Sequence, residues 1–463
     1  MRLAATERSP PYPAGDLRMA AGSASLGVLF LTVLLDLLGF GLVIPLVQPY
    51  VDHYWRMESP DSAYVARIAT ALSACYSGAQ FLFAPMWGAL SDRIGRRPVL
   101  LTTIPLLGLA YLLFGLVADE NVNHYFLPNV NLLKGDKVIG TVVSGHAVVY
   151  ALFATRTLGG VFAANISTAF AYVADVTTPA NRAKGMGMIG AAFGIGFTIG
   201  PFVGGVLAHE FGRGAPGYAA AALALVNSIW AVARLKESLP PEKRGALGPR
   251  RGRMELLREQ LSTPALGKLL VLSFLATFAF AHMEQGLSLF LKLEPERGGR
   301  GYGEHEIGYA FGYIGIVAVI VQGGLMRSLG KRYGERPLIL LGWTMLALGL
   351  AGIGYFGWES FPLAMLAVSG FLMAVGNSIS NPSLSSLISR TAPATAQGSV
   401  FGANQSMGSL ARIFGPLSAG WFADSLTRAA PMYVAAAGTL VAILVFLTLP
   451  REITAKARNE DSG

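Results

Sequence analysis

Long apolar segments recur along the whole chain and are separated by short polar segments. A helix needs about 20 apolar residues to cross the roughly 30 Å core of a bilayer. Twelve stretches of about this length carry almost no charge, and we expect each to form a membrane-spanning helix. They are residues 26–47, 68–90, 98–118, 147–173, 186–208, 218–233, 269–291, 308–326, 337–358, 360–389, 399–423 and 431–449.

The longest polar segment, residues 236–264, divides these stretches six and six. We therefore expect an all-α membrane protein with twelve transmembrane helices in two pseudo-symmetric six-helix bundles. Transmembrane β-barrels are excluded because they alternate in polarity over segments of roughly ten residues. The expected parts are an N-terminal tail (1–25), a first bundle (26–235), a central loop (236–264), a second bundle (265–449) and a C-terminal tail (450–463).

The composition agrees with this assignment. Of the 463 residues, 53% are hydrophobic and only 14% are charged, whereas soluble domains carry about 25% charged residues. If both termini are cytoplasmic, the inner loops hold 25 of the 36 Lys and Arg residues and the outer loops hold 9. This asymmetry follows the positive-inside rule. We expect a multi-pass protein of the cell membrane with cytoplasmic termini, facing anionic lipid at the inner surface, and the net charge of +9 does not require nucleic acid.

The two halves repeat each other faintly. Gly200-Pro201 in the first half recurs as Gly415-Pro416 in the second. Repeated halves around a central loop are typical of secondary transporters, whose substrate sites lie near the midplane between the halves. Residues 119–146 have no comparably long counterpart in the second half, and we expect them to form an outer loop.

Four formally charged residues fall inside the apolar stretches: Asp36, Arg156, Glu284 and Arg412. Insertion scales give roughly +2.5 to +3.5 kcal/mol for such a residue at a helix centre, so these residues are functional candidates. Two acids and two bases suggest pairing inside a water-filled cavity between the halves. Static buried ion pairs are the alternative, which is less favoured because such pairs stabilise proteins poorly.

Asp36 lies at the middle of the first stretch and is the predicted principal proton carrier. Burial favours the neutral form of a carboxyl group and a nearby arginine favours the charged form. A carboxyl exposed to both influences in turn can load and release protons. Arg156 is expected either to tune Asp36 or to hold an anionic group of the substrate, and its alternative role is to anchor helix packing.

Glu284 is expected to bind a second proton or a cationic substrate, or else to pair with Arg412. His282 lies two positions away and hence on another helix face, and we expect a packed or water-bonded histidine more than a proton relay. The predicted proton-coupling residues are Asp36, Glu284 and Arg156. The predicted cavity residues are Asp36, Arg156, Asn165, His282, Glu284, Gln285, Asn377, Asn404 and Arg412.

Glycines recur every four residues in the fifth stretch, at Gly196, Gly200 and Gly204. This spacing predicts a groove that admits the backbone of another helix. Gly205 extends the motif, and Pro201 permits a kink. A dinucleotide-binding motif is excluded because no strand precedes these glycines.

The loop between the second and third stretches contains Gly88, Asp92, Arg93, Gly95, Arg96 and Arg97. Its arginines are suited to hold the helix hairpin at the inner membrane surface. Its one acid can neutralise an arginine or bind a helix N-terminus. Such a contact can break when the halves move, so we predict a conformational latch, with plain topological anchoring as the alternative.

These motifs together resemble the drug:proton antiporter branch of the major facilitator superfamily, close to tetracycline-resistance efflux proteins. The resemblance rests on residues 36–45, 88–98, 156–160 and 196–205. It implies alternation between inward-open and outward-open states and exchange of a substrate for protons, with the proton gradient as the energy source and no cofactor.

We therefore expect a monomeric exporter of small amphipathic, drug-like compounds. The alternative is a proton-coupled symporter or facilitator of a metabolite such as an organic anion or sugar. An enzyme is disfavoured because no nucleophile–base arrangement appears, and a metal site is disfavoured because no HxxxH or CxxC spacing appears. A sensor or scaffold is disfavoured because it would need a soluble signalling domain.

Overall fold

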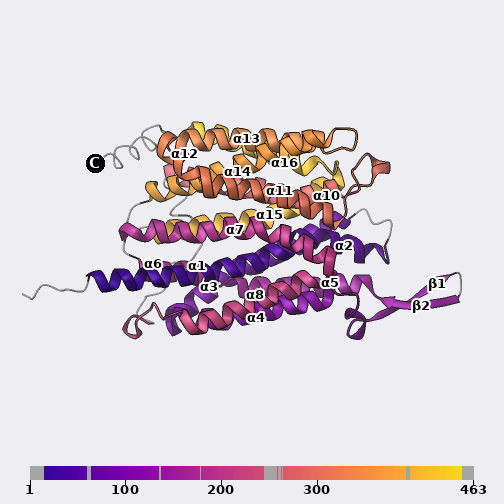
Figure 1. The fold of residues 1–463 in the computed structure, drawn as a ribbon, viewed down its shortest axis with the longest axis horizontal. Helices are drawn as coiled ribbons and strands as arrows, with labels where there is room; N and C mark the ends of the chain where they lie inside the picture. Colours follow the sequence, from indigo (N-terminus) through magenta and orange to yellow (C-terminus); the bar gives the residue numbers. More distant parts are fainter. Residues whose placement is uncertain are drawn as a thin grey trace, which may run out of the picture.

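Long helices run side by side in one bundle, and a β-hairpin projects from one end of it (Figure 1). The computed structural model describes residues 15–59, 64–134, 137–177, 179–244, 258, 262, 264–392 and 397–450. We call the end that carries the β-hairpin the hairpin end. The opposite end is where the first helix begins and the last helix ends.

The helices before residue 245 are α1 (Gly15–Val43), η1 (Ile44–Leu46), α2 (Val47–Arg56), α3 (Val65–Ile94), α4 (Arg96–Ala118), η2 (Asn123–Tyr125), α5 (Gly145–Ala163), α6 (Ile166–Val176), α7 (Pro179–Phe211), α8 (Ala215–Arg234) and η3 (Pro241–Lys243). Those after residue 263 are α10 (Pro264–Leu291), η4 (Pro295–Arg297), α11 (Glu304–Ile320), the π-helix η5 (Val321–Leu325), α12 (Met326–Tyr333), α13 (Glu335–Phe356), α14 (Leu363–Thr391), α15 (Gln397–Ser425) and α16 (Ala430–Leu447).

Nine helical segments of the described chain are long and apolar enough to cross a membrane, which makes this a multi-pass membrane protein. They account for nine of the twelve predicted stretches. The other three stretches form α3, α7 and α15, long helices of the same bundle that are not among the nine. α3 packs against α15, and α7 packs against α11, so these helices form contacts between the halves. Helices that face other helices can carry more small and polar residues than helices that face lipid.

Two predicted stretches differ from single helices. The first continues through the 3₁₀ turn η1, which contains Pro45, into α2. The fourth is divided into α5 and α6 by Ala164 and Asn165. The break between α5 and α6 places the side chain of Asn165 next to Asp36 of α1.

The segment 119–146 contains a β-hairpin that the sequence did not predict. Strand β1 (Asn129–Lys134) pairs antiparallel with β2 (Lys137–Val143), with an irregular register between Leu132 and Leu133. The hairpin projects away from the helices (Figure 1). It is a local addition to an otherwise helical fold.

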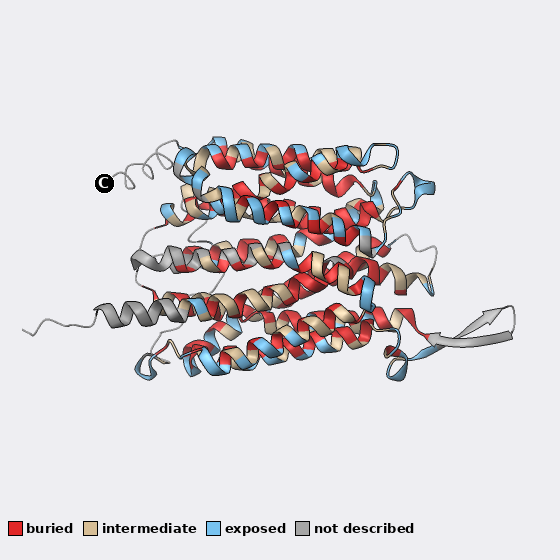
Figure 2. Cartoon of the chain, viewed as in Figure 1, coloured by how far each residue is buried: buried red, intermediate tan, exposed pale blue. Residues whose placement is uncertain are grey.

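Apolar side chains pack mainly within each half. The largest buried cluster is drawn from residues 266–449, and two further clusters come from the helices before residue 236. Phe401 of α15 packs against a first-half cluster at the opposite end. Figure 2 shows exposed residues on the outer faces of the helices, and many of these are large and apolar, such as Leu109, Leu348 and Leu444. Such apolar outer faces are suited to contact lipid rather than water.

α1 and α7 cross where glycines leave room for their backbones. A Cβ atom added at Gly200 would lie 2.5 Å from the Cα of Gly41, and one at Gly204 would lie 2.0 Å from the carbonyl oxygen of Leu42. Gly196 is similarly pressed against Leu37. The GxxxG spacing of α7 therefore forms its contact face with α1.

The neighbouring motif residues differ in their surroundings. Gly205 faces the second half, because a Cβ atom added at Gly308 of α11 would lie 3.2 Å from its Cα. Pro201 is buried within α7. One stretch of α7 therefore contacts both α1 and α11.

Ion pairs join the two halves at the hairpin end. Lys292 Nζ lies 3.0 Å from Asp52 Oδ2. The backbone N–H of Arg67 donates to Asp424 Oδ2 over 3.1 Å, and its guanidinium donates to Ser425 Oγ over 2.8 Å. These contacts close the hairpin end of the interface.

Glu58 lies just beyond α2 at the same end. It accepts hydrogen bonds from Ser144 Oγ, over 2.7 Å, and from the backbone N–H of His146. Burial raises the pKa of Glu58, but these hydrogen bonds and the nearby His146 outweigh burial and leave the pKa below its ordinary value. Glu58 therefore ties the end of α2 to the start of α5 in its charged form.

Candidate functional site

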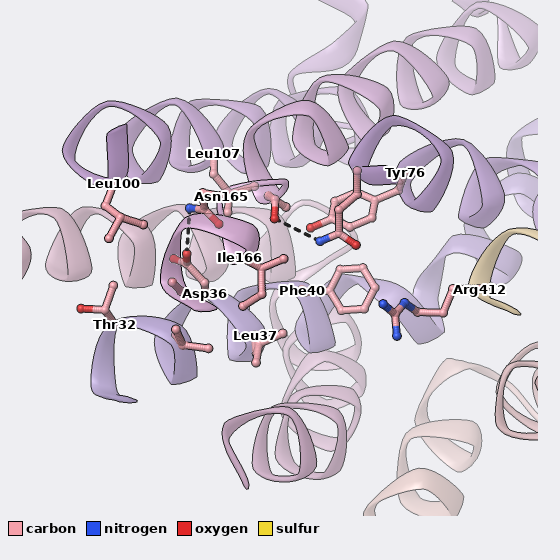
Figure 3. Close-up of a pocket in the computed structure, with 14 residues that line it drawn as sticks. Thr32, Asp36, Leu37, Phe40, Tyr76, Leu100, Leu107, Asn165, Ile166 and Arg412 are labelled. Carbon is pink, nitrogen blue, oxygen red and sulfur yellow. Dashed lines mark hydrogen bonds between the residues drawn. The ribbon is translucent and has the colours of Figure 1, made fainter. Parts of the chain in front are cut away.

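A small cavity opens in the first half, where it faces the second (Figure 3). Its polar and aromatic lining includes Asp36, Phe40, Tyr76, Gln80, Asn165 and Arg412. Its volume of about 30 Å³ is enough for one or two water molecules, whereas drug-sized ligands occupy pockets of about 300–1,000 Å³. A drug-sized ligand therefore does not fit this cavity in the conformation described.

Two asparagines hold Asp36. Asn227 Nδ2 donates to Asp36 Oδ1 over 2.8 Å, and Asn165 Nδ2 donates to Asp36 Oδ2 over 3.4 Å. In the described part of the chain, the hydrogen bonds to this carboxyl come from these amides and not from Arg156, so the expected pairing of the two is not seen. Asp36 is partly exposed and lines the cavity, where it can exchange a proton.

Arg156 of α5 is 2% exposed and lies beside two adjacent aromatic rings, whose centres are 4.8 Å apart. Its guanidinium carbon is 4.4 Å from the ring centre of Tyr76 and 5.6 Å from that of Phe40. None of its three guanidinium nitrogens has a hydrogen-bond partner among the described residues. Cation–π contacts compensate part of the cost of burying this charge. Arg156 is not part of the cavity lining, and its role in holding an anionic group stays a prediction.

Arg412 reaches the cavity from α15 and so brings in the second half. In Figure 3, Phe40 lies between Arg412 and Asp36. Glu284 of α10 is 7% exposed, and the charges of Arg412 and Arg156 both act on it. The structure thus brings Glu284 near the two arginines, and Arg412 also lines the cavity that contains Asp36.

His282 lies between α10 and α15, outside the cavity lining. Its Nδ1 is 3.1 Å from the carbonyl oxygen of Phe278, and its Nε2 is 3.2 Å from Ser418 Oγ. The side chain is fully buried. These contacts describe a packed histidine that ties two helices together.

Three predicted cavity amides also lie outside the lining of this cavity. Gln285 Oε1 accepts a hydrogen bond from Ser73 Oγ over 3.1 Å, which joins α10 to α3 across the halves. Asn377 accepts from Asn381 one turn further along α14. Asn404 lies on α15. Their role in binding stays a prediction.

The loop between α3 and α4 is fastened through Arg96, which is 2% exposed. Its guanidinium pairs with Asp92, donates to Asp175 Oδ2 over 2.9 Å and donates to Ser91 Oγ over 2.7 Å. Asp175 lies at the end of α6. Asp92 therefore neutralises an arginine of its own loop, and the loop is tied to α6.

Glu237, just after α8, holds the other side of this loop. It accepts from the backbone N–H groups of Arg96 and Arg97 over 2.9 and 3.2 Å. Gly95 has φ +109°, and a Cβ atom there would lie 2.2 Å from Glu237 Oε2, so only glycine fits. Arg97 also donates to the carbonyl oxygen of Leu235.

The other two loop residues differ in burial. Gly88 is buried, and Arg93 is exposed. The contacts described for this loop lie within the first half or with Glu237 at the start of the central loop, so its action as a latch between the halves stays a prediction.

Several site residues were missed by sequence reasoning. Asn227 is the important one, and its signal was a single amide inside an otherwise apolar stretch. Tyr76 and Gln80 were also missed. Asp175 and Glu237 lie at helix ends next to the signature loop, where acids opposite arginines could have been sought.

The fold and the site together define a class of protein. Two helical halves that meet around a small polar cavity form the architecture of many secondary transporters. The sequence profile of the Major Facilitator Superfamily matches residues 29–358 and 299–463, and the chain belongs to this family. The resemblance inferred from the motifs is confirmed, since the relatives include tetracycline resistance proteins and a multidrug resistance protein.

Among sequence relatives, the class C tetracycline resistance protein of Escherichia coli is 29% identical over 390 residues, which cover 83% of this chain and 86% of that protein. Major facilitator superfamily domain-containing protein 10 of Bos taurus is 29% identical over 458 residues, 90% of this chain and 91% of that protein.

Among solved structures, the human organic anion transporter MFSD10 (TETRAN) superposes with a TM-score of 0.66 at 26% identity, covering 92% of this chain and 99% of that one. The xylose transporter XylE of E. coli, in a partially occluded inward-open conformation, gives a TM-score of 0.67 at 15% identity, covering 93% and 98%. The second match bears on the fold alone.

Proposed function

We propose that this protein exports small amphipathic compounds across the cell membrane in exchange for protons, acting as a monomer by alternating access. Asp36 is the proton carrier, and the proton gradient supplies the energy without a cofactor. The observation that carries the proposal is the pair of asparagines on Asp36. A carboxylate held by neutral amides can take up a proton without leaving a buried cation unpaired.

The arrangement across the interface supports coupling between proton and substrate. Glu284, Arg156 and Arg412 lie where the halves meet, and Asp36 lines the cavity next to them. Substrate entry requires the halves to separate, and this changes the surroundings of all four residues. With cytoplasmic termini, the hairpin end is extracellular, and the ion pairs there close the outer entrance.

A second candidate function is proton-coupled symport or facilitated passage of an organic anion. Arg156 favours it, because its guanidinium is buried without a hydrogen-bond partner among the described residues. The structural relative described as an organic anion transporter supports the same substrate class. In this case the anionic group binds Arg156 and the proton still travels on Asp36.

Transport by purified protein in proteoliposomes tests both candidates, with tetracycline and the anionic dye fluorescein as probes. Under a pH gradient, antiport predicts that tetracycline accumulates in the compartment from which protons leave. Movement of fluorescein together with protons in one direction would instead favour symport. Asp36→Asn should abolish uphill transport of either probe, and uphill transport by this variant would refute the assignment of Asp36.

A further inference from the structure

Asn227 makes two donor contacts with α1 from its place on α8. Its Nδ2 lies 2.8 Å from Asp36 Oδ1 and 2.9 Å from the carbonyl oxygen of Thr32. The side chain is fully buried. Both hydrogens of one amide nitrogen are therefore used, one on the backbone of α1 and one on the carboxyl group one turn further along.

The Thr32 contact fixes which end of the amide faces Asp36. A backbone carbonyl only accepts hydrogen bonds, so the amide atom beside it must be the nitrogen. The same nitrogen faces Asp36, and the amide cannot turn its oxygen there without losing both contacts. Asn227 consequently presents a donor to Asp36 as long as its contact with Thr32 is kept. A donor binds a carboxylate more strongly than it binds the neutral acid.

Burial of this amide is not explained by helix packing. The other residues on the buried face of α8 are small, including Gly217, Ala220, Ala224 and Ala231. The Oδ1 atom of Asn227 is buried and has no partner among the described residues. A buried oxygen without a hydrogen bond is destabilising, so an apolar residue would serve packing better. The two hydrogen bonds that Asn227 donates therefore explain why an amide side chain occupies this buried position.

We propose that Asn227 is a positioning residue that sets the proton affinity of Asp36, with the Thr32 carbonyl as its fixed support. The inference rests on the proposed role of Asp36 as proton carrier and deepens it. Asn227 stabilises the charged carboxylate and so opposes the effect of burial, which favours the neutral acid. Asn165 does the same more weakly, because its contact is longer.

Other groups around Asp36 leave this role to the amides. Among the residues that the structure describes, the charge of Asp36 acts on Tyr76 of α3 and Tyr111 of α4, whose phenol groups are of a kind that is neutral at physiological pH. Arg412 lines the same cavity from α15, on the far side of Phe40. α7 contributes glycines to its contact with α1.

Infrared titration of the purified protein tests the inference without a substrate. The C=O band of a protonated carboxyl is followed against pH, and its loss in Asp36→Asn assigns it. Asn227→Leu removes both donors and should move the midpoint up by about one pH unit, a tenfold gain in proton affinity. Asn165→Leu, the matched control with the longer contact, should move it by less than half as much.

The outcomes separate this inference from the proposed function. If no titrating band disappears in Asp36→Asn, both fail. If the band is assigned but its midpoint in Asn227→Leu stays within about 0.3 pH units of the unmodified protein, the inference alone is overturned. If Asn227→Leu does not fold, Asn227→Ser provides the test. Its shorter hydroxyl side chain is a weaker donor to Asp36, so the midpoint of the titration should move up, but by less than in Asn227→Leu. An unchanged midpoint in Asn227→Ser would overturn the inference.

Discussion

The close contact of Gly200 of α7 with Gly41 of α1 offers a direct test of the packing. In Gly200→Ala the added methyl group would lie 2.5 Å from the Cα and 2.6 Å from the carbonyl carbon of Gly41. Both distances are about 0.9–1.5 Å shorter than an ordinary carbon–carbon contact of about 3.5–4.0 Å. The atoms it meets are backbone atoms, which cannot turn aside as a flexible side chain can. The two helices must therefore separate.

The cost follows from overpacking. Extra methyl groups in a packed interior destabilise proteins by about 1–3 kcal/mol, and alanine recovers at most about 1 kcal/mol through its better helix propensity. We expect a net destabilisation of roughly 1–2 kcal/mol. Thermal unfolding in detergent, followed by the fluorescence of a thiol-reactive dye at the single cysteine, Cys75, should show Tm lowered by a few degrees.

Gly438→Ala is the matched control. Apart from its chain neighbours and the backbone of its own helix, no described atom lies within 4 Å of a Cβ atom added at Gly438 of α16. The change should therefore leave Tm unchanged or raise it slightly. If Gly200→Ala is as stable as Gly438→Ala, the helices are not in contact at Gly200 and the packing account of the GxxxG motif is wrong.

Three further outcomes are expected. Lys292→Asp should open the hairpin end, seen as faster labelling of a cysteine placed there, and adding Asp52→Lys should reverse this; no recovery would contradict the pairing. Arg96→Met leaves Asp92 buried without its cation and should destabilise the protein by about 3–5 kcal/mol, measured by thermal unfolding; an unchanged Tm would count against it. Because the pKa of Glu58 is lowered on folding, its stabilisation is complete above 4.5, its ordinary value, and is lost as pH falls below it. Glu58→Gln should therefore lower Tm at neutral pH and converge with the unmodified protein in acid; a constant difference would exclude this.

The helices could be predicted because a bilayer demands long apolar segments, and such segments are visible without knowing any contact. The β-hairpin at 129–143 could not, since it projects away from the helices and its apolar pattern is weak. Charge alone gave only some of the partners: the charge of Arg412 acts on Glu284, as one alternative expected, but Asp36 is bound by amides and not by Arg156. The role of Asn227 could not be predicted, because a single amide in an apolar helix can face lipid, a cavity or another helix. The sequence does not distinguish these three positions.

Among the described residues, different kinds of contact hold the two ends of the interface, so ionic strength should affect the two ends differently. Charges join the halves at the hairpin end, whereas Phe401 makes an apolar contact at the opposite end. Dissolved salt screens charges over about 8 Å at physiological ionic strength, and less where a pair is partly buried, whereas it hardly changes an apolar contact. The cations of the pairs at the hairpin end are partly exposed, since the side chain of Lys292 is 28% and that of Arg67 is 38% exposed. A rise in ionic strength on the hairpin side should therefore ease opening toward that side more than toward the opposite one.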